Sequence, residues 1–162
     1  MNKNLSDILH ESIELELNIS RLYTLFHDLY PEDEELWWQL AIEERNHAAL
    51  LRYEKSNQQN GCSLAEGFLA PDLEGIREAN SLVITLIERF GDNCPPREEA
   101  FSTALEIENS IGEAHYQAFL DSDEVHSVAD ELFRQLNQGD KDHARRIEAY
   151  VASHTHTMEE LM

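Results

Sequence analysis

The sequence Glu43-Glu44-Arg45-Asn46-His47 lies in the middle of a long stretch with helical periodicity. Three residues of helix turn about 300°, so Glu44 and His47 lie on one face, one turn apart. The rest of that face is apolar and carries Trp37, Leu40, Ala41, Ala48 and Leu51. A carboxylate on a core-facing stripe costs free energy unless it is paired, protonated or bound to a metal. This stretch therefore predicts a buried polar site inside a helical domain.

A second pair of the same kind, Asp140-x-x-His143, occurs late in the chain, also on an apolar helical stripe. Two further acids, Glu16 and Glu108, fall on the apolar stripes of two other expected helices. Counted along the helices from the connecting turns, the heights of these acids and of Glu44 agree to within about one helical turn. We therefore expect all four acids to meet near the middle of a helical bundle.

The composition and length of the chain favour a single helical domain that spans residues 1–162. Glycine and proline are sparse, with 6 and 4 residues, while alanine, leucine, glutamate and glutamine are plentiful. The 162 residues can bury a substantial core. The formal net charge of −21 argues against nucleic acid and anionic membranes as partners. It indicates a solvated acidic surface and a chain that attracts cations.

The ends and the cysteines of the chain favour a cytoplasmic protein. No run of about 18 apolar residues predicts a membrane span, and the first residues, Met1 to Ser6, lack the apolar block of a secretory signal. Cys62 and Cys94 form no Cys-x-x-Cys unit, so the sequence predicts neither a rubredoxin-type site nor a zinc ribbon. A reduced pair of thiols is expected rather than a disulfide.

The hydrophobic pattern predicts four long helices and one shorter helix. The long helices are expected over residues 6–30, from 33 into 56–61, over 96–120 and over 124–150, and the shorter helix over 72–90. Short turns within each hairpin make the paired helices antiparallel. About 35 residues join the two hairpins, a length that suits a crossover along a four-helix bundle, with the extra helix packed outside it.

Four converging carboxylates cannot all be ionised in a core without cations. With the two imidazoles, the expected metal ligands are Glu16, Glu44, His47, Glu108, Asp140 and His143. Such an oxygen-rich set suits iron or manganese better than a structural zinc. Two divalent ions would balance the charge, with Glu44 and Glu108 as bridges. Glu16 and His47 would complete one metal, and Asp140 and His143 the other.

These helices resemble the metal-binding helices of the ferritin-like superfamily, with ferritins and rubrerythrins the nearest members. The resemblance lies in Leu15-Glu16-Leu17 with Ser20 and Tyr23, in the segment from Glu43 to Ala48, and in the segment from Ala104 to Asn109. It implies a ferritin-like antiparallel four-helix bundle, two bound iron ions (or manganese, or mixed occupancy) and self-association into a dimer or larger homo-oligomer.

The chain also departs from that family. Its last pair begins with Asp140, where the histidine-bearing members usually have glutamate, and aspartate is one methylene shorter. Ile111 stands where rubrerythrins usually carry an additional glutamate. The chain lacks a rubredoxin-like iron site, and its tail is too short for the fifth helix of ferritins, which puts assembly of a cage in doubt.

The resemblance implies redox chemistry with O₂ or hydrogen peroxide. The first hypothesis is a ferroxidase or peroxide-reducing di-iron oxidoreductase. The alternatives are a non-catalytic iron or manganese binding or storage protein, a di-iron substrate hydroxylase, and a metal-free bundle with paired acids. Tyr23, one turn of the face from Glu16, is the candidate catalytic residue, or a plain core tyrosine. Glu43 is either an acid that hydrogen-bonds an imidazole or a solvated surface residue.

Overall fold

The computed structural model describes residues 3–59, 73–109, 138 and 142–154, and these residues are almost entirely helical. The elements in order are α1 (Lys3–Leu29), a short 3₁₀ turn η1 (Pro31–Asp33), α2 (Glu34–Gln59), α3 (Leu73–Asp92) and α4 (Arg97–Ile107). A last helix covers residues 142–154. No strand occurs in the described part of the chain, so the expectation of an all-α fold is confirmed there.

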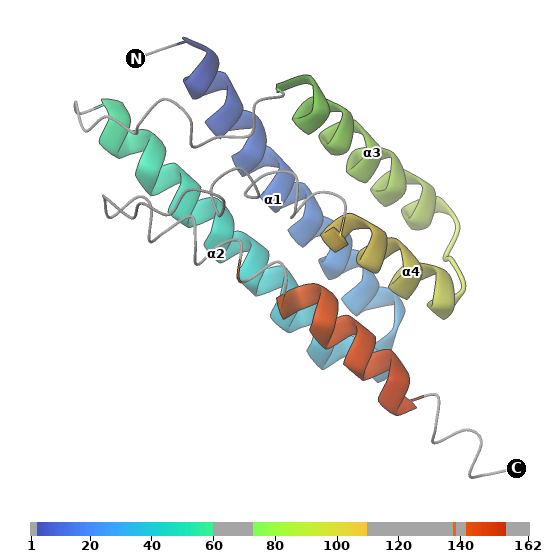
Figure 1. The fold of residues 1–162 in the computed structure, drawn as a ribbon. Helices are drawn as coiled ribbons and strands as arrows, with labels where there is room; N and C mark the ends of the chain where they lie inside the picture. The colour runs from blue at the N-terminus through green and yellow to red at the C-terminus, as the bar shows by residue number, and fades with distance from the viewer. Residues whose placement is uncertain (1–2, 60–72, 110–137, 139–141, 155–162) are drawn as a thin grey trace, which may run out of the picture.

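Helices α1 and α2 form an antiparallel hairpin, since only Tyr30 and η1 separate them (Figure 1). Their facing stripes bury large apolar side chains. The ring centroids of Trp37 lie 5.7 Å from Tyr23 and 5.0 Å from Phe26, and all three side chains have no exposed surface. Full burial of each such side chain stabilises the fold by about 1.5–3 kcal/mol. The hairpin is therefore a rigid frame for the polar residues on the same stripes.

Helix α3 runs parallel to α1 and packs along it (Figure 1). Arg77, near its start, reaches Glu11, while Phe90, near its end, packs on Phe26 with 5.8 Å between ring centroids. Between these points the buried side chain of Asn80 accepts a hydrogen bond of 3.0 Å from Asn18. Because α2 and α3 run in opposite directions, α3 carries the chain back to the end of the molecule where α4 begins.

Helix α4 and the helix of residues 142–154 make contacts at the start of α2. The Arg97 guanidinium donates to both oxygens of Asp33 at 2.6 and 2.7 Å, and the Tyr150 hydroxyl donates to Asp33 at 2.9 Å. Phe101 packs on Trp37 with 4.8 Å between ring centroids. These contacts hold α4 parallel to α2 and the last helix antiparallel to it.

The observed bounds differ from the expected ones in a few places. Helix α1 begins at Lys3 rather than at residue 6. Pro96 precedes the first residue of α4 instead of lying in its first turn. The expected continuation to residue 120, the start of the last long helix and Cys62 lie outside the described residues. In the part of the chain that the structure describes, no helix is long and apolar enough to cross a membrane.

Candidate metal centre

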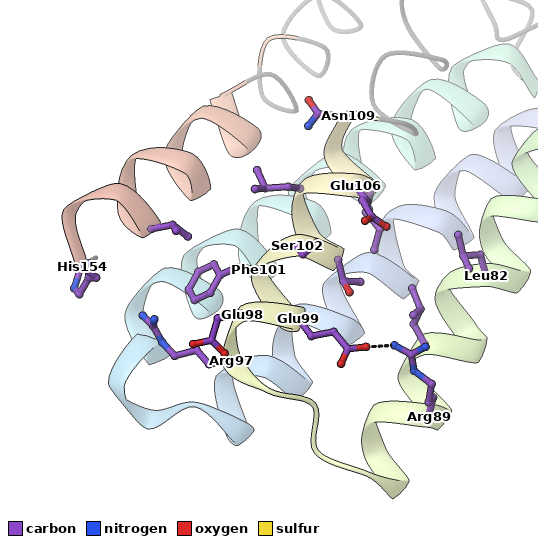
Figure 2. A pocket seen from close by; sticks show the side chains of 15 residues that line it. Leu82, Arg89, Arg97, Glu98, Glu99, Phe101, Ser102, Glu106, Asn109 and His154 are labelled. Carbon is purple, nitrogen blue, oxygen red and sulfur yellow. Dashed lines mark hydrogen bonds and ion pairs between the residues drawn. The ribbon is translucent and has the colours of Figure 1, made fainter. Parts of the chain in front are cut away.

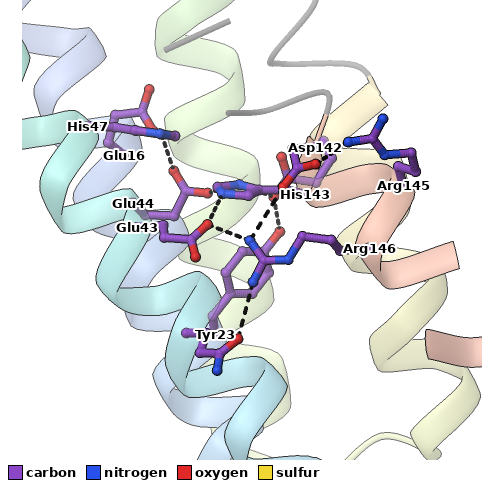
Figure 3. Close-up of polar contacts among 11 residues, drawn as sticks. Glu16, Tyr23, Glu43, Glu44, His47, Asp142, His143, Arg145 and Arg146 are labelled. Carbon is purple, nitrogen blue, oxygen red and sulfur yellow. Dashed lines mark hydrogen bonds and ion pairs between the residues drawn. The ribbon is translucent and has the colours of Figure 1, made fainter. Parts of the chain in front are cut away.

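Five of the six expected metal ligands lie together in the interior. Figure 3 shows Glu16, Glu44, His47 and His143 among them. Glu16 comes from α1, Glu44 and His47 from α2, and His143 from the last helix. Glu108 lies in the short π-helical stretch that directly continues α4. Their exposed fractions are between 1% and 8%. Each side chain lies on the apolar stripe of its helix, and burial of that stripe carries the polar residue into the core. The sixth expected ligand, Asp140, lies outside the described residues.

The first group of ligand atoms comes from Glu16, Glu44 and His47. Nδ1 of His47 lies 3.2 Å from Oε2 of Glu44 and 3.7 Å from Oε2 of Glu16. One ligand atom from each of the three residues lies within 4.8 Å of the others, which is close enough for a single cation to contact all of them. The Glu44 and His47 pair on one helical turn is therefore completed by α1.

The second group comes from Glu44, Glu108 and His143, whose ligand atoms also lie within 4.8 Å of one another. Nδ1 of His143 is 2.8 Å from Oε1 of Glu44 and 3.6 Å from Oε1 of Glu108. Glu44 thus offers one oxygen to each group, as a bridging carboxylate does. Glu108, which the sequence also predicts as a bridge, belongs only to the second group.

Two opposing effects set the pKa values in this cluster, namely burial and the close ion pairs between carboxylates and imidazoles. Burial raises the pKa of Glu16 to about 7. Burial acts in the same direction on Glu44, but the close imidazoles of His143 and His47 outweigh it and hold its pKa at about 2. Burial alone would lower the pKa of both imidazoles, yet the carboxylates raise that of His47 to about 11 and that of His143 well above its usual range. Without cations, the histidines therefore serve as the counter-charges.

One observation in particular indicates that this set of donor atoms suits a pair of divalent cations. Nδ1 of His143 is fully buried and has no hydrogen-bond partner. It lies within 2.8 Å of a carboxylate oxygen, but no acceptor lies in line with its N–H direction. A buried polar atom without a partner is unfavourable, and a cation among the carboxylates would satisfy it. Oxygen donors with a few imidazole nitrogens suit iron and manganese.

Tyr23 contacts the site through a ligand. Its hydroxyl donates a hydrogen bond of 2.5 Å to Oε1 of Glu108, and its side chain has no exposed surface. The candidate catalytic tyrosine therefore contacts a candidate metal ligand directly. The position in α1 alone could not identify Glu108 as the partner, because the two residues are 85 positions apart.

Glu43 also belongs to the site, although its side chain is 38% exposed. Hydrogen bonds from His143 and Arg146 lower its pKa to about 2. The sequence left Glu43 undecided between an imidazole partner and a surface acid, and the structure selects the imidazole. Sequence reasoning did not place Arg146 at the site, although its guanidinium also donates to the Glu43 carboxylate.

Comparison with family models, characterised proteins and solved structures finds no match for this chain.

Proposed function

We propose that this chain is a di-metal carboxylate protein of the ferritin-like kind, and that it uses ferrous iron to reduce O₂ or hydrogen peroxide. One observation carries the proposal: a single buried carboxylate, Glu44, joins two groups of ligand atoms that come from separate helices. A chain that needed buried acids only for packing would pair each with one partner, and would have no reason to place both histidines on one carboxylate.

The directions of the helices support the ferritin-like architecture. Helices α1 and 142–154 run one way, and α2 and α4 run the other way, around the site (Figure 1). Helix α3 provides the crossover that a bundle of this connectivity needs. We therefore infer a four-helix bundle with α3 packed outside it against α1.

The reaction needs two electrons and a dry site. Two ferrous ions held by these carboxylates and imidazoles would supply one electron each. With two protons, the two electrons would reduce hydrogen peroxide to two waters, or O₂ to hydrogen peroxide. The chain's own part is to hold the ligands at fixed positions and to exclude water, which the apolar stripes around Glu16, Glu44 and Glu108 do.

Stopped-flow absorption tests the proposed function. Metal-free protein is loaded with two ferrous ions per chain and mixed with O₂ in one series and with hydrogen peroxide in another. We expect oxidation at least about tenfold faster than in buffer with one of the two oxidants, together with the visible spectrum of a ferric pair. Oxidation at the buffer rate with both oxidants would overturn the proposal. Metal analysis of protein from its native host would identify the ion that it carries there.

Replacement of Tyr23 by phenylalanine should slow the oxidation about tenfold without changing the number of ions bound. The hydroxyl orients Glu108 through a hydrogen bond to a charged group, and loss of about 1.4 kcal/mol of that bond corresponds to a factor of ten in rate. Single-turnover kinetics with ferrous iron measure the effect, and equilibrium uptake is the control. An unchanged rate would make Tyr23 a plain core residue.

Binding of two divalent cations should release about two to three protons at pH 7. The imidazoles of His47 and His143 carry protons in the ion-free cluster, because the neighbouring carboxylates raise their pKa values, and Nδ1 of each ring must lose its proton to bind a metal. Glu16, with a pKa of about 7, adds part of another. Affinity should therefore fall as the pH is lowered. Calorimetry in buffers of different ionisation enthalpy measures the release, and heats independent of the buffer would contradict it.

The two other candidate functions make different demands on the molecule. Storage of iron as a mineral needs a closed cage, so gel filtration that shows a dimer or another small oligomer would exclude it. A substrate hydroxylase needs an apolar channel to the metals. A groove of about 1460 Å³ does run along α4, lined by Leu82, Leu86, Leu105 and Val151 among others (Figure 2). None of the five described ligands lines it, so the groove does not favour a hydroxylase.

A further inference from the structure

Glu43 and His143 meet at the rim of the metal centre. Oε2 of Glu43 lies 2.7 Å from Nε2 of the imidazole, which is the ring nitrogen on the far side from the other carboxylates. The side chain of His143 is 1% exposed, whereas that of Glu43 is 38% exposed. A carboxylate that solvent could hydrate is thus turned inward onto a buried ring.

Arg146 holds that carboxylate in place. Its Nη1 donates to the same oxygen of Glu43 at 2.6 Å (Figure 3). Its Nη2 donates to Oε1 of Gln39 at 3.3 Å. Arg146 lies three residues after His143, on the same face of the last helix, and Gln39 lies one turn before Glu43 on α2. Two positions on each helix therefore fix the register of the last helix against α2.

The contact with Glu43 also affects Nδ1, the other ring nitrogen of His143. An imidazole whose Nε2–H is donated to a carboxylate has its Nδ1 lone pair free for a metal, and the hydrogen bond also fixes the direction of the ring. Nδ1 of His143 faces Glu44 and Glu108, the other members of the second group. We propose that Glu43, held by Arg146, is a positioning residue that sets the affinity of the second cation site and leaves the first site unchanged. This inference rests on the proposed function.

The competing interpretation is an ordinary surface ion pair between α2 and the last helix. Such a pair would contribute about 0–1 kcal/mol to stability and would not distinguish the two cations. Arg145, the neighbour of Arg146, is a matched control because its side chain is 76% exposed and pairs with Asp142. The positioning role therefore predicts that only substitution of Glu43 weakens one binding step, whereas an ordinary surface ion pair predicts that no substitution does.

Calorimetric titration with Co²⁺ separates them. Wild type is compared with Glu43→Gln, which keeps an acceptor without the charge, with Glu43→Leu, which removes the acceptor, and with Arg145→Gln. We expect two binding steps in wild type, one of them weakened about 10-fold by Glu43→Gln and about 100-fold by Glu43→Leu, and no change in Arg145→Gln. In Zn²⁺-loaded protein, NMR should show a slowly exchanging Nε2–H of His143 that exchanges faster in Glu43→Leu.

Each result bears on a distinct claim. Equal weakening of both steps, no weakening of either, or a slow Nε2–H that persists in Glu43→Leu would overturn the positioning role while leaving the two-cation site intact. Fewer than two Co²⁺ ions bound by wild type would overturn the proposed function and this inference with it. Circular dichroism of the metal-free variants shows that they fold, and failure of Glu43→Leu alone leaves Glu43→Gln to decide.

Discussion

Replacement of Glu44 by glutamine should weaken the binding of both cations by more than about 100-fold and reduce ferrous oxidation to the rate in buffer. The reason is its position. Glu44 offers one oxygen to His47 and Glu16, and the other to His143 and Glu108. An amide keeps the shape of the side chain, but it loses the charge that two cations would share. No other described residue belongs to both groups.

The measurement is a titration of the variant with Co²⁺ and with ferrous iron, next to wild type and Glu106→Gln. Glu106 is exposed on α4, two residues before a ligand, so its variant controls for a lost negative charge. Retention of either binding step at the wild-type affinity would show that the carboxylate is not shared. The metal-free variant should also be less stable, because the imidazoles of His47 and His143 lose a buried counter-charge. Circular dichroism measures that separate effect.

Replacement of Asp33 by alanine should lower the free energy of unfolding by about 3 kcal/mol, the low end for breaking a buried ion pair. Asp33 is 1% exposed, and its carboxylate accepts two hydrogen bonds from Arg97 and one from Tyr150. Helix α4 and the last helix both lose their common partner on η1 when it is removed. For a chain of this size the midpoint of thermal unfolding should fall by roughly 6–12 °C.

The control for Asp33 is Glu99→Ala. Glu99 also pairs with an arginine, Arg89, at 2.5 Å, but the two side chains are 45% and 53% exposed. An exposed pair contributes less than about 1 kcal/mol, so this variant should unfold close to the wild-type temperature. About three helical turns separate Asp33 from Glu44, so Asp33→Ala should still bind two Co²⁺ ions. Equal effects of the two substitutions would contradict the distinction between buried and exposed pairs.

Most of the site was predictable because helices have a fixed period. The position of a residue on an apolar stripe indicates whether it faces the core, so Glu16, Glu44, His47, Glu108 and His143 could be chosen from sequence alone. The same reasoning placed Trp37 on the apolar stripe, and the structure confirms it, with an exposed fraction of 0%. Counting residues from the turns placed the acids at one height, since the rise per residue is constant.

The sequence could not identify which side-chain atoms would contact one another. Whether Glu43 touches an imidazole depends on the register between α2 and a helix 100 residues away, and Arg97 reaches Asp33 across 64 residues. Long polar side chains have several rotamers, and only the packed helices select one. The helical pattern alone shows which residues face the interior and at what height. The shared role of Glu44, the contact of Glu43 with His143 and Arg146, and the contacts of Asp33 with Arg97 and Tyr150 become visible only in the folded chain. Each of them depends on how helices that are distant in the chain pack together.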